Sequence, residues 1–411
     1  MTQVIRVPRD YSFSEAFFGT PSSQNTDMYD QTASDGDRPL GCRMTGGVAL
    51  SYAFTGHSSL FAHKYNGVNA FDTVRYWVAN KPNGDVYSCC SISVVDTDKV
   101  FVNYTAQSFP TWTSITCVDR VQYNYAANTL TRIGTDNLFS GTTGSPYGTG
   151  NKRVYTCQVG SNRVFYLHVP FMQTGDTGIV TYGWPSYMLT DFSGTVIKTW
   201  TTFPYNVSQA GYYRPLLLYL GPYALLSANT SGGQIYAYIL TLNGTSDDVA
   251  VSSPFTTPAA TDYSTNSLDT LSTGEPYRVF ASASYSLYNQ YGTIWAMDVT
   301  STGVTMSPAC PVIPAPDNQQ VGSCYVTALD SERIALVGTY NRAKIWATMA
   351  KYKGGAWTTD GLLNLVPYMR VLGTSPWPGP IVSANSGISC AQISGMAYSA
   401  GNFWPMPVYT R

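Results

Sequence analysis

Charged side chains are scarce in this 411-residue chain, which carries only 23 Lys and Arg and 24 Asp and Glu. They make up 11% of the residues, whereas an average soluble domain has about 25%. Glutamate is almost missing, because Glu15, Glu275 and Glu332 are its only occurrences. Glu and Lys favour helices, whereas the abundant Tyr, Thr, Gly and Asn favour strands and turns. The composition therefore predicts an all-β fold.

Several other features are missing, and each absence excludes a class of function. With a net charge of −1 and no cluster of Lys and Arg, the chain offers no surface for nucleic acid. No stretch reaches the roughly 18 consecutive apolar residues of a membrane span; the nearest, "RPLLLYLGPYALL" (214–226), is interrupted by Gly221-Pro222. The N-terminus, "MTQVIRVPRDYSF", lacks the apolar core of a secretory signal. We therefore expect neither membrane insertion nor conventional export.

One hairpin pattern recurs along the chain. It is clearest in "ALDSERIALVGTY" (328–340), where an apolar segment, a polar turn and the cation Arg333 precede an apolar run ending in Tyr. The successive anchors of the pattern are spaced by 52, 64, 61, 54, 55 and 63 residues, and they are Gly47, Lys99, Arg163, Ala224, Arg278, Arg333 and Met396. Such near-constant spacing, with several short strands in each unit, predicts a repeat architecture.

Units of this length, each with the pattern of a four-stranded meander, resemble the β-propeller superfold, in which radial repetition protects the sheet edges. The resemblance covers about residues 41–411 and rests on repeat length and strand pattern, because no diagnostic family motif is present. It implies an all-β propeller of seven blades, each a four-stranded antiparallel sheet, with six or eight blades as alternatives.

Residues 1–40 do not fit the repeat and form a separate N-terminal segment. The alternating "TQVIRV" (2–7) is predicted to supply the outer strand of the last blade and so to close the ring. Residues 8–40 are predicted to form an extended arm whose Phe17 and Phe18 contact a neighbouring subunit; a linker is the alternative.

Eight cysteines are present, and five repeat units place one in the strand before the repeat turn, in "GCRM", "SCCS", "YTCQ", "SCYV" and "SCAQ". A recurring Cys fits a crowded inner strand where a small apolar side chain packs well. No CxxC pair exists, and His57, His63 and His168 are far apart in the sequence, so we expect no metal site. Disulfides between subunits remain an alternative.

Recurring turn carboxylates are the candidates for catalysis. Asp96, Asp98 and Asp330 occupy equivalent turns, and a glycosidase needs two carboxylates. Acidic residues in turns, however, also serve local hydrogen bonding. The cations that recur once per unit are better explained as structural residues that bind loop carbonyls or pair with Asp. "AYSAG" (397–401) and the glycine-rich 140–152 loop lack the context of a nucleophile elbow or phosphate loop. We therefore assign no catalytic residue and no cofactor.

Three Trp-Pro pairs are the candidate binding residues: Trp184 (with Tyr187 nearby), Trp377 and Trp404. Because proline removes a ladder donor, these tryptophans are expected at strand ends or in loops. A loop tryptophan can present a flat apolar face to a sugar ring or a protein. Filling of the gaps between blades is the alternative role.

The low charge and the rigid, loop-presenting ring predict a non-enzymatic structural or binding protein located in a virus particle. At fold level the chain is similar to propeller proteins of phage tails and virion appendages. This similarity implies a symmetric assembly with other virion proteins and contact with a host-surface glycan or protein. The alternative is a carbohydrate-active propeller enzyme, a glycoside hydrolase or lyase with carboxylates in its channel.

Overall fold

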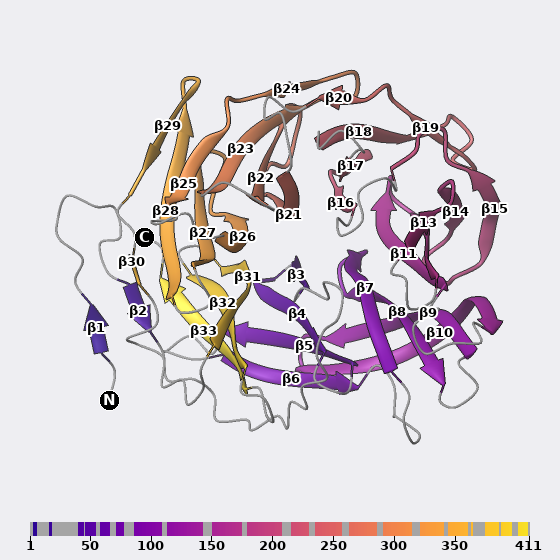
Figure 1. Ribbon diagram of the computed structural model, residues 1–411, viewed down its shortest axis with the longest axis horizontal. Coiled ribbons are helices and arrows are strands. Elements are labelled where there is room, and N and C mark those ends of the chain that lie inside the picture. The colour runs from indigo at the N-terminus through magenta and orange to yellow at the C-terminus, as the bar shows by residue number, and fades with distance from the viewer. Residues whose placement is uncertain are drawn as a thin grey trace.

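The computed structural model of the protein is a ring of antiparallel sheets (Figure 1). It describes residues 3–5, 16–18, 40–44, 46–54, 58–65, 71–77, 86–108, 113–142, 150–174, 179–207, 215–229, 235–256, 263–285, 291–314, 321–340, 344–360, 363–364, 375–385, 388–396 and 402–409. These residues contain no helix that could cross a membrane.

Six sheets of four or five strands form the blades, which we number 1–6 in chain order. Blade 1 contains β3 (Leu40–Met44), β4 (Val48–Phe54), β5 (Ser58–Tyr65) and β6 (Phe71–Trp77). Blade 2 contains β7 (Val86–Val95), β8 (Lys99–Ser108), β9 (Thr113–Asn124) and β10 (Thr129–Thr142). Blade 3 contains β11 (Gly150–Val159), β12 (Arg163–Thr174), β13 (Ile179–Tyr182), β14 (Ser186–Thr190) and β15 (Val196–Thr202).

The next three blades have their outer strand divided in two. Blade 4 contains β16 (Leu216–Tyr219), β17 (Tyr223–Asn229), β18 (Ile235–Leu242), β19 (Val249–Val251) and β20 (Phe255–Thr256). Blade 5 contains β21 (Tyr263–Thr270), β22 (Tyr277–Tyr285), β23 (Tyr291–Val299), β24 (Val304–Met306) and β25 (Cys310–Pro314). Blade 6 contains β26 (Val321–Ala328), β27 (Arg333–Tyr340), β28 (Lys344–Lys353), β29 (Ala356–Thr359) and β30 (Leu363–Asn364).

The first strand of each blade lies beside the first strand of the next, so these strands surround the ring axis (Figure 1). Since neighbouring strands are antiparallel, the connections from first to second strand lie at one end of the ring, which we call the short-turn end. The predicted hairpin at 328–340 is confirmed as β26, a turn and β27. Lys99, Arg163 and Arg333 each begin a second strand, as the repeat predicts.

The structure confirms the all-β propeller of antiparallel sheets, with six blades, the lower of the two alternative counts, in place of the preferred seven. The last segment forms a three-stranded sheet, the closing sheet, with β31 (Ser375–Asn385), β32 (Ile388–Met396) and β33 (Asn402–Tyr409). It lies between blade 6 and blade 1, where β31 neighbours both β26 and β3.

Proline explains why the closing sheet ends at β33. Pro405 and Pro407 are two residues apart, so both ring nitrogens face the same edge of the strand. A continuous ladder between β33 and β32 requires that edge to be the outer one. The outer edge therefore lacks two N–H donors and offers no regular ladder to a fourth strand.

The N-terminal strand does not fill this position. β1 (Gln3–Ile5) pairs with β2 (Ala16–Phe18) in a sheet of its own. β2 lies beside β33 without joining its ladder. Of the predicted strand in residues 2–7, the structure describes residues 3–5, which pair with β2 in the arm.

The apolar core is divided among the gaps between successive blades, which we call seams. The buried cluster around Phe165, Leu189 and Leu226, for example, joins blades 3 and 4. This follows from strand geometry, because alternate side chains point to opposite faces and each blade buries both faces against its neighbours. The core is therefore a series of sheet-on-sheet contacts around the axis.

The recurring cysteines largely follow the prediction. Cys42, Cys157 and Cys324 lie in first strands, and the last two are buried. Cys390 is an exception, because it lies in β32, the second strand of the closing sheet. Because segment 389–401 resembles segment 41–53, the sequence predicted a first strand where the structure has the second strand of the closing sheet. Cys117 is a free, buried thiol in β9.

Candidate functional site: an exposed tryptophan and a clasp across the ring

Trp184 lies in the connection between β13 and β14, as the Trp-Pro pattern predicts. Its side chain is 54% exposed, the largest fraction among the described exposed apolar residues. The indole Nε1 nevertheless donates a 2.6 Å hydrogen bond to the carbonyl of Phe203. An exposed tryptophan with its only donor occupied offers a partner the faces of its ring.

Two backbone hydrogen bonds fix the chain on both sides of this tryptophan. The Gly183 N–H donates to the carbonyl of Pro170 over 3.3 Å, and the Phe203 N–H donates to the carbonyl of Pro185 over 2.9 Å. A Cβ at Gly183 would lie 2.9 Å from the Cβ of Pro170, so only glycine fits this approach. Trp184 is therefore exposed and rigid at once, which lowers the entropy cost of binding.

Aromatic rings pack around Phe203, whose backbone carbonyl accepts the hydrogen bond of Trp184. Phe203 is fully buried and contacts the rings of Tyr205 and Tyr238, each with centroids 6.4 Å away. Tyr205 and Tyr238 in turn lie 5.1 Å apart. This packing between blades 3 and 4 holds Phe203, and with it the acceptor of the Trp184 hydrogen bond, in a fixed position.

Tyr187, the predicted neighbour of Trp184, is buried in the seam between blades 3 and 4. Its hydroxyl donates to Asp248 over 2.8 Å, and Lys198 lies 5.5 Å above its ring and pairs with the same carboxylate. Burial raises the pKa of Tyr187, and the Asp248 carboxylate raises it further. These contacts connect blade 3 to blade 4.

The other predicted aromatic residues lie within strands. Trp377 is in β31 and Trp404 is in β33, so neither lies at a strand end or in a loop as expected. Edge strands tolerate proline when its nitrogen faces outward, which explains the difference. Phe17 and Phe18 are in β2. The side chains of these four residues lie outside the described part of the structure.

The turn carboxylates are used locally. Asp330 Oδ1 accepts the N–H groups of Glu332 and Arg333 over 2.8 and 2.7 Å. Asp96 pairs with Lys99, and Asp98 accepts from the Gln122 amide over 2.8 Å. Burial tends to raise the pKa of Asp330, but the Arg333 side chain and turn amides outweigh it and lower that pKa.

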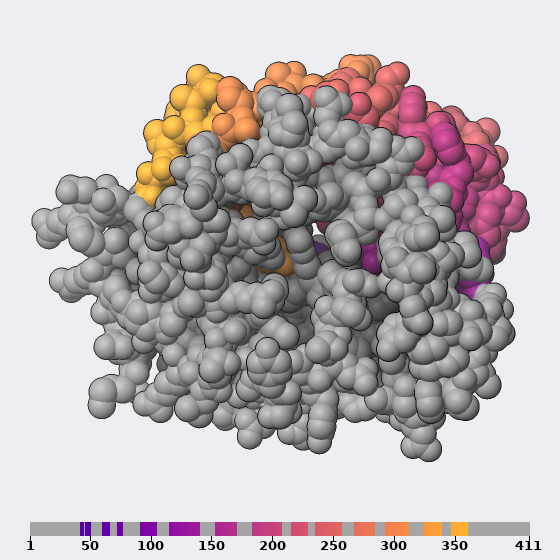
Figure 2. Space-filling model, in the orientation of Figure 1, coloured from indigo at the N-terminus to yellow at the C-terminus, as the bar shows by residue number. Residues whose placement is uncertain are grey.

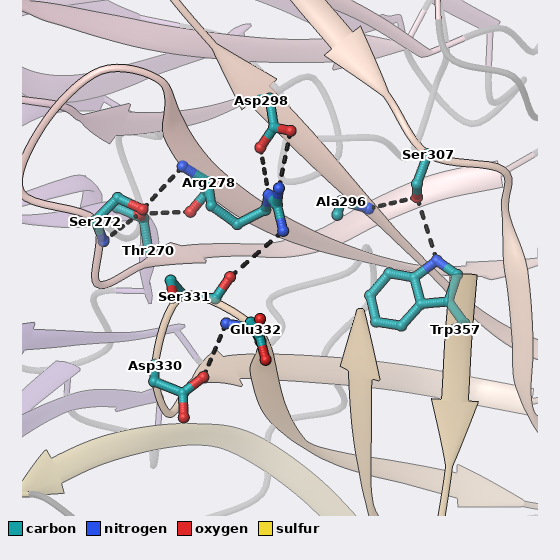
Figure 3. Close-up of polar contacts among 10 residues, drawn as sticks. All are labelled: Thr270, Ser272, Arg278, Ala296, Asp298, Ser307, Asp330, Ser331, Glu332 and Trp357. Atoms are coloured by element: carbon teal, nitrogen blue, oxygen red, sulfur yellow. Dashed lines mark hydrogen bonds and ion pairs between the residues drawn. The ribbon is translucent and has the colours of Figure 1, made fainter. Parts of the chain in front are cut away.

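The repeat cations bind carbonyls and aspartates, as the sequence predicts. Arg163 donates to the carbonyl of Ser246 in blade 4 over 2.7 Å. Two guanidinium nitrogens of Arg278 donate hydrogen bonds to the Asp298 carboxylate (Figure 3). The third nitrogen donates to the carbonyl of Ser331 in blade 6. These side chains connect adjacent blades at the short-turn end.

Arg43 is a structural cation that the sequence did not reveal. It lies in β3 of blade 1, yet its Nη2 is 2.7 Å from Asp269 Oδ1 and 2.7 Å from the Thr270 carbonyl, both in blade 5. Its Nη1 is 3.5 Å from the carbonyl of Ala328 in blade 6. We call these contacts the Arg43 clasp. Arg43 and Asp269 are 226 residues apart, so no local pattern could indicate the pair.

Asp269 is also held by blade 6. Its Oδ2 accepts the Thr327 hydroxyl over 2.7 Å and the Ala328 N–H over 2.8 Å. The Arg43 and Asp269 side chains are only 17% and 18% exposed. Beside them, burial raises the pKa of Cys42 to about 12, with the Asp269 carboxylate adding to the shift, so the thiol is not activated. The clasp is thus fully hydrogen-bonded at its carboxylate.

Asp119, which sequence analysis also missed, is the most buried carboxylate among the residues that the structure describes. It accepts hydrogen bonds from Thr135 Oγ1 at 2.6 Å, Tyr76 Oη at 3.0 Å and Tyr104 Oη at 3.4 Å, and Tyr76 belongs to blade 1. Burial raises its pKa, and the hydrogen bonds oppose that shift. Asp119 has no exposed surface. Asp119 and its hydroxyl donors therefore form a buried polar contact in the seam between blades 1 and 2.

Metal ligands do not gather among the residues that the structure describes: no three His, Cys, Asp or Glu side chains form a group that could hold an ion. His63 is buried against Phe61 and contacts Thr73 over 2.9 Å. Burial lowers its pKa to about 3, so it is a neutral core residue.

The chain resembles known proteins only distantly. No protein-family model and no curated protein sequence matches the chain. Among solved structures it is similar to a Dyadobacter fermentans protein of unknown function, with 11% identity, a TM-score of 0.45, and coverage of 91% of this chain and 98% of that one. It is also similar to the six-bladed Aleuria aurantia lectin (9% identity, TM-score 0.45, coverage 82% and 97%).

A third similar structure is the β-propeller domain of the Trilobed protease from Pyrococcus furiosus, with 8% identity, a TM-score of 0.39 and coverage of 90% and 94%. At these values the similarities say nothing about activity or ligands. The sheet order by itself makes the chain an all-β propeller with six blades of at least four antiparallel strands.

Proposed function

We propose that the protein is a non-enzymatic structural and binding component of a virus particle, in which the rigid ring docks to neighbouring particle proteins. The observation that carries the binding role is Trp184, an exposed aromatic ring fixed by its own hydrogen bond and by those of its neighbours. Rigid aromatic side chains are the usual energetic centres of interfaces.

The assignment to a particle rests on composition. A polar surface with few charges and abundant Tyr, Thr, Ser and Gly suits a protein that works inside an assembly. The engagement of the described turn carboxylates in local hydrogen bonds supports a scaffold over a hydrolase. A carbohydrate-active enzyme is the outcome that would replace this proposal.

The test is to ask whether the protein copurifies with intact virus particles in a fixed ratio, and whether Trp184→Ala weakens its binding to the rest of the particle or to host cells. A contribution of about 2 kcal/mol at an interface centre corresponds to a loss of about 30-fold in affinity. Leu271→Ala is the matched control, because Leu271 is another exposed apolar residue, located in blade 5. Absence from particles together with hydrolysis of a glycan library would overturn the proposal.

A further inference from the structure

The turn between β18 and β19 of blade 4 contains an Asn-Gly pair, Asn243 and Gly244. The Ser246 N–H donates to the Asn243 carbonyl over 2.9 Å and closes the turn. Asn243 and Gly244 are both exposed, and β19 lies at the outer rim of the ring (Figure 1). The described residues of blade 4 form part of the visible rim in Figure 2. Water therefore reaches the Asn243 side chain.

An asparagine followed by glycine can lose its side-chain amide without an enzyme. The main-chain nitrogen of the glycine attacks the side-chain carbonyl carbon and closes a five-membered succinimide ring. The side-chain nitrogen leaves as ammonia and takes the proton that the attacking nitrogen gives up. Water then opens the ring and leaves either aspartate or isoaspartate. Glycine favours the attack, because it has no Cβ to obstruct the approach.

The turn arranges the reacting groups of this pair. Asn243 Oδ1 accepts the Asp247 N–H over 3.3 Å and lies 3.0 Å from the Thr245 hydroxyl. Donors at this oxygen stabilise the negative charge that develops on it during the attack. The Gly244 N–H donates no hydrogen bond to a described residue, so the attacking nitrogen is not engaged elsewhere. The electrophile is thus activated while the nucleophile stays available.

The same turn carries contacts of blade 4 with blade 3. The Ser246 carbonyl accepts a hydrogen bond from Arg163 Nε over 2.7 Å. Asp248 accepts the hydroxyl of the buried Tyr187 over 2.8 Å and also pairs with Lys198. A change in the shape of the turn therefore acts directly on the seam between these two blades.

The Asn243 side chain supports that shape through Asp247. Its Nδ2 donates to Asp247 Oδ1 over 3.1 Å. Conversion to aspartate replaces this donor with a second carboxylate, so two negative charges face each other across the turn. Isoaspartate also lengthens the main chain by one carbon, which displaces the Ser246 N–H from its acceptor at residue 243.

We propose that Asn243 is a self-modification site, which converts through a succinimide to aspartate or isoaspartate and so weakens the contact between blades 3 and 4. Water is the only co-reactant. The amide is not restored afterwards, so the modified fraction grows with the age of the protein. This inference does not depend on the function proposed above.

Incubation of the full chain at mildly alkaline pH, followed by peptide mapping with mass spectrometry, tests the reaction. The peptide that contains Asn243 should gain the mass that separates a carboxyl group from an amide, and isoaspartate should elute as a second peak. Gly244→Ala is the matched variant, because a Cβ there meets nothing within 4 Å in the folded turn. The same Cβ hinders the attack, so the rate should fall at least about tenfold. An equal rate in Gly244→Ala overturns the proposal.

The contribution of the turn is measured against the same chain denatured in urea. Folded Asn243 should react at least as fast as denatured Asn243, since only the folded turn supplies donors to its Oδ1. Thr245→Val should slow the reaction in the folded protein and leave the denatured rate unchanged. Retention of the Asn243 amide in the folded protein, while the denatured chain loses it, overturns the proposal.

The effect on the seam is measured on separated chains. Anion exchange resolves modified chains, because each carries an additional negative charge. Two other Asn-Gly pairs, at residues 66–67 and 83–84, lie outside the described residues, so only the fraction modified at residue 243 alone is used. Its urea midpoint should lie below that of unmodified chains from the same incubation, and Gly244→Ala incubated in parallel should keep its midpoint. Equal midpoints for modified and unmodified chains overturn the proposed weakening.

Discussion

Blade 6 and the closing sheet are neighbours in the ring, yet their backbones differ in what they can bond. The strands of blade 6, β26–β30, contain no proline, whereas β31 and β33 of the closing sheet contain five. Blade 6 reaches five strands and the closing sheet stops at three. A repeat in the side-chain pattern is therefore no guarantee of a repeat in hydrogen-bonding capacity.

Two seams between blades contain a serine that hydrogen-bonds to the backbone of the next blade. Between blades 5 and 6, the Ser267 hydroxyl accepts the N–H of Val326 over 2.7 Å, and Ser282 donates to the carbonyl of Cys324 over 2.7 Å. Blade 2 repeats this arrangement against blade 3, where Ser91 accepts the Thr156 N–H over 3.4 Å. We call these contacts the serine bridges. In both blades a register shift comes directly before the serine.

The greatest loss of stability is expected from Asp119→Ala, at the seam between blades 1 and 2. The substitution removes a shared acceptor of the Thr135, Tyr76 and Tyr104 hydroxyls. The free energy of unfolding should fall by about 3 kcal/mol, as measured by urea denaturation. A fall of less than about 1 kcal/mol would contradict a large contribution of this seam to stability.

Gly194→Ala should cost about 2 kcal/mol at the seam between blades 2 and 3. Gly194 has φ +89°, and an added Cβ would lie 2.8 Å from the guanidinium carbon of Arg120, which Asp136 holds in place. Gly244→Ala is the control, because a Cβ there meets nothing within 4 Å. Thermal denaturation of both variants gives the comparison, and equal shifts would contradict the prediction.

Ser267→Ala removes one serine bridge and should cost about 1.5 kcal/mol, because the buried Val326 N–H loses its acceptor. Ser253→Ala, at an exposed position of blade 4, should change the free energy of unfolding by less than about 0.5 kcal/mol. Chemical denaturation of the two variants measures the difference, and a difference near zero would show that the bridges add nothing.

Asp119 also predicts a dependence of stability on pH. Its pKa in the folded protein is raised above the ordinary value of 3.8, mainly by burial. The folded state therefore holds this proton more tightly than the unfolded state, so this group's contribution to stability falls as pH rises from about 4 through the folded pKa. Comparing denaturation curves of the unmodified protein and Asp119→Asn isolates the effect, because the variant lacks this slope. A parallel pH profile for both proteins would contradict it.

The smallest change in folding free energy is expected from Pro405→Val combined with Pro407→Val, yet this variant tests the comparison most directly. It restores two N–H donors to the outer edge of β33. An edge with its donors intact can pair with another strand. We expect concentration-dependent association in analytical ultracentrifugation, with Pro308→Val, outside the strands of blade 5, as the control. A variant that associates no more than this control would refute the role of the prolines.

Sequence reasoning found what is local and missed what is distant. The turn before Arg333 was identifiable because its strands, turn and cation lie within thirteen residues. The exposed position of Trp184 followed from the adjacent proline. The pair of Arg43 and Asp269 and the seam position of Asp119 were not identifiable, because their partners come from other blades. The last repeat unit shows a different error, because residues that resemble a first strand in the sequence form the second strand of the closing sheet.

The serine bridges also bear on how such a ring can change in length. The serine and the N–H that it binds belong to different blades. A duplication that keeps the bridge must therefore copy a sheet together with the first strand of the next blade. Duplication of a lone sheet would place Ser91 or Ser267 opposite a strand that was not selected to receive it.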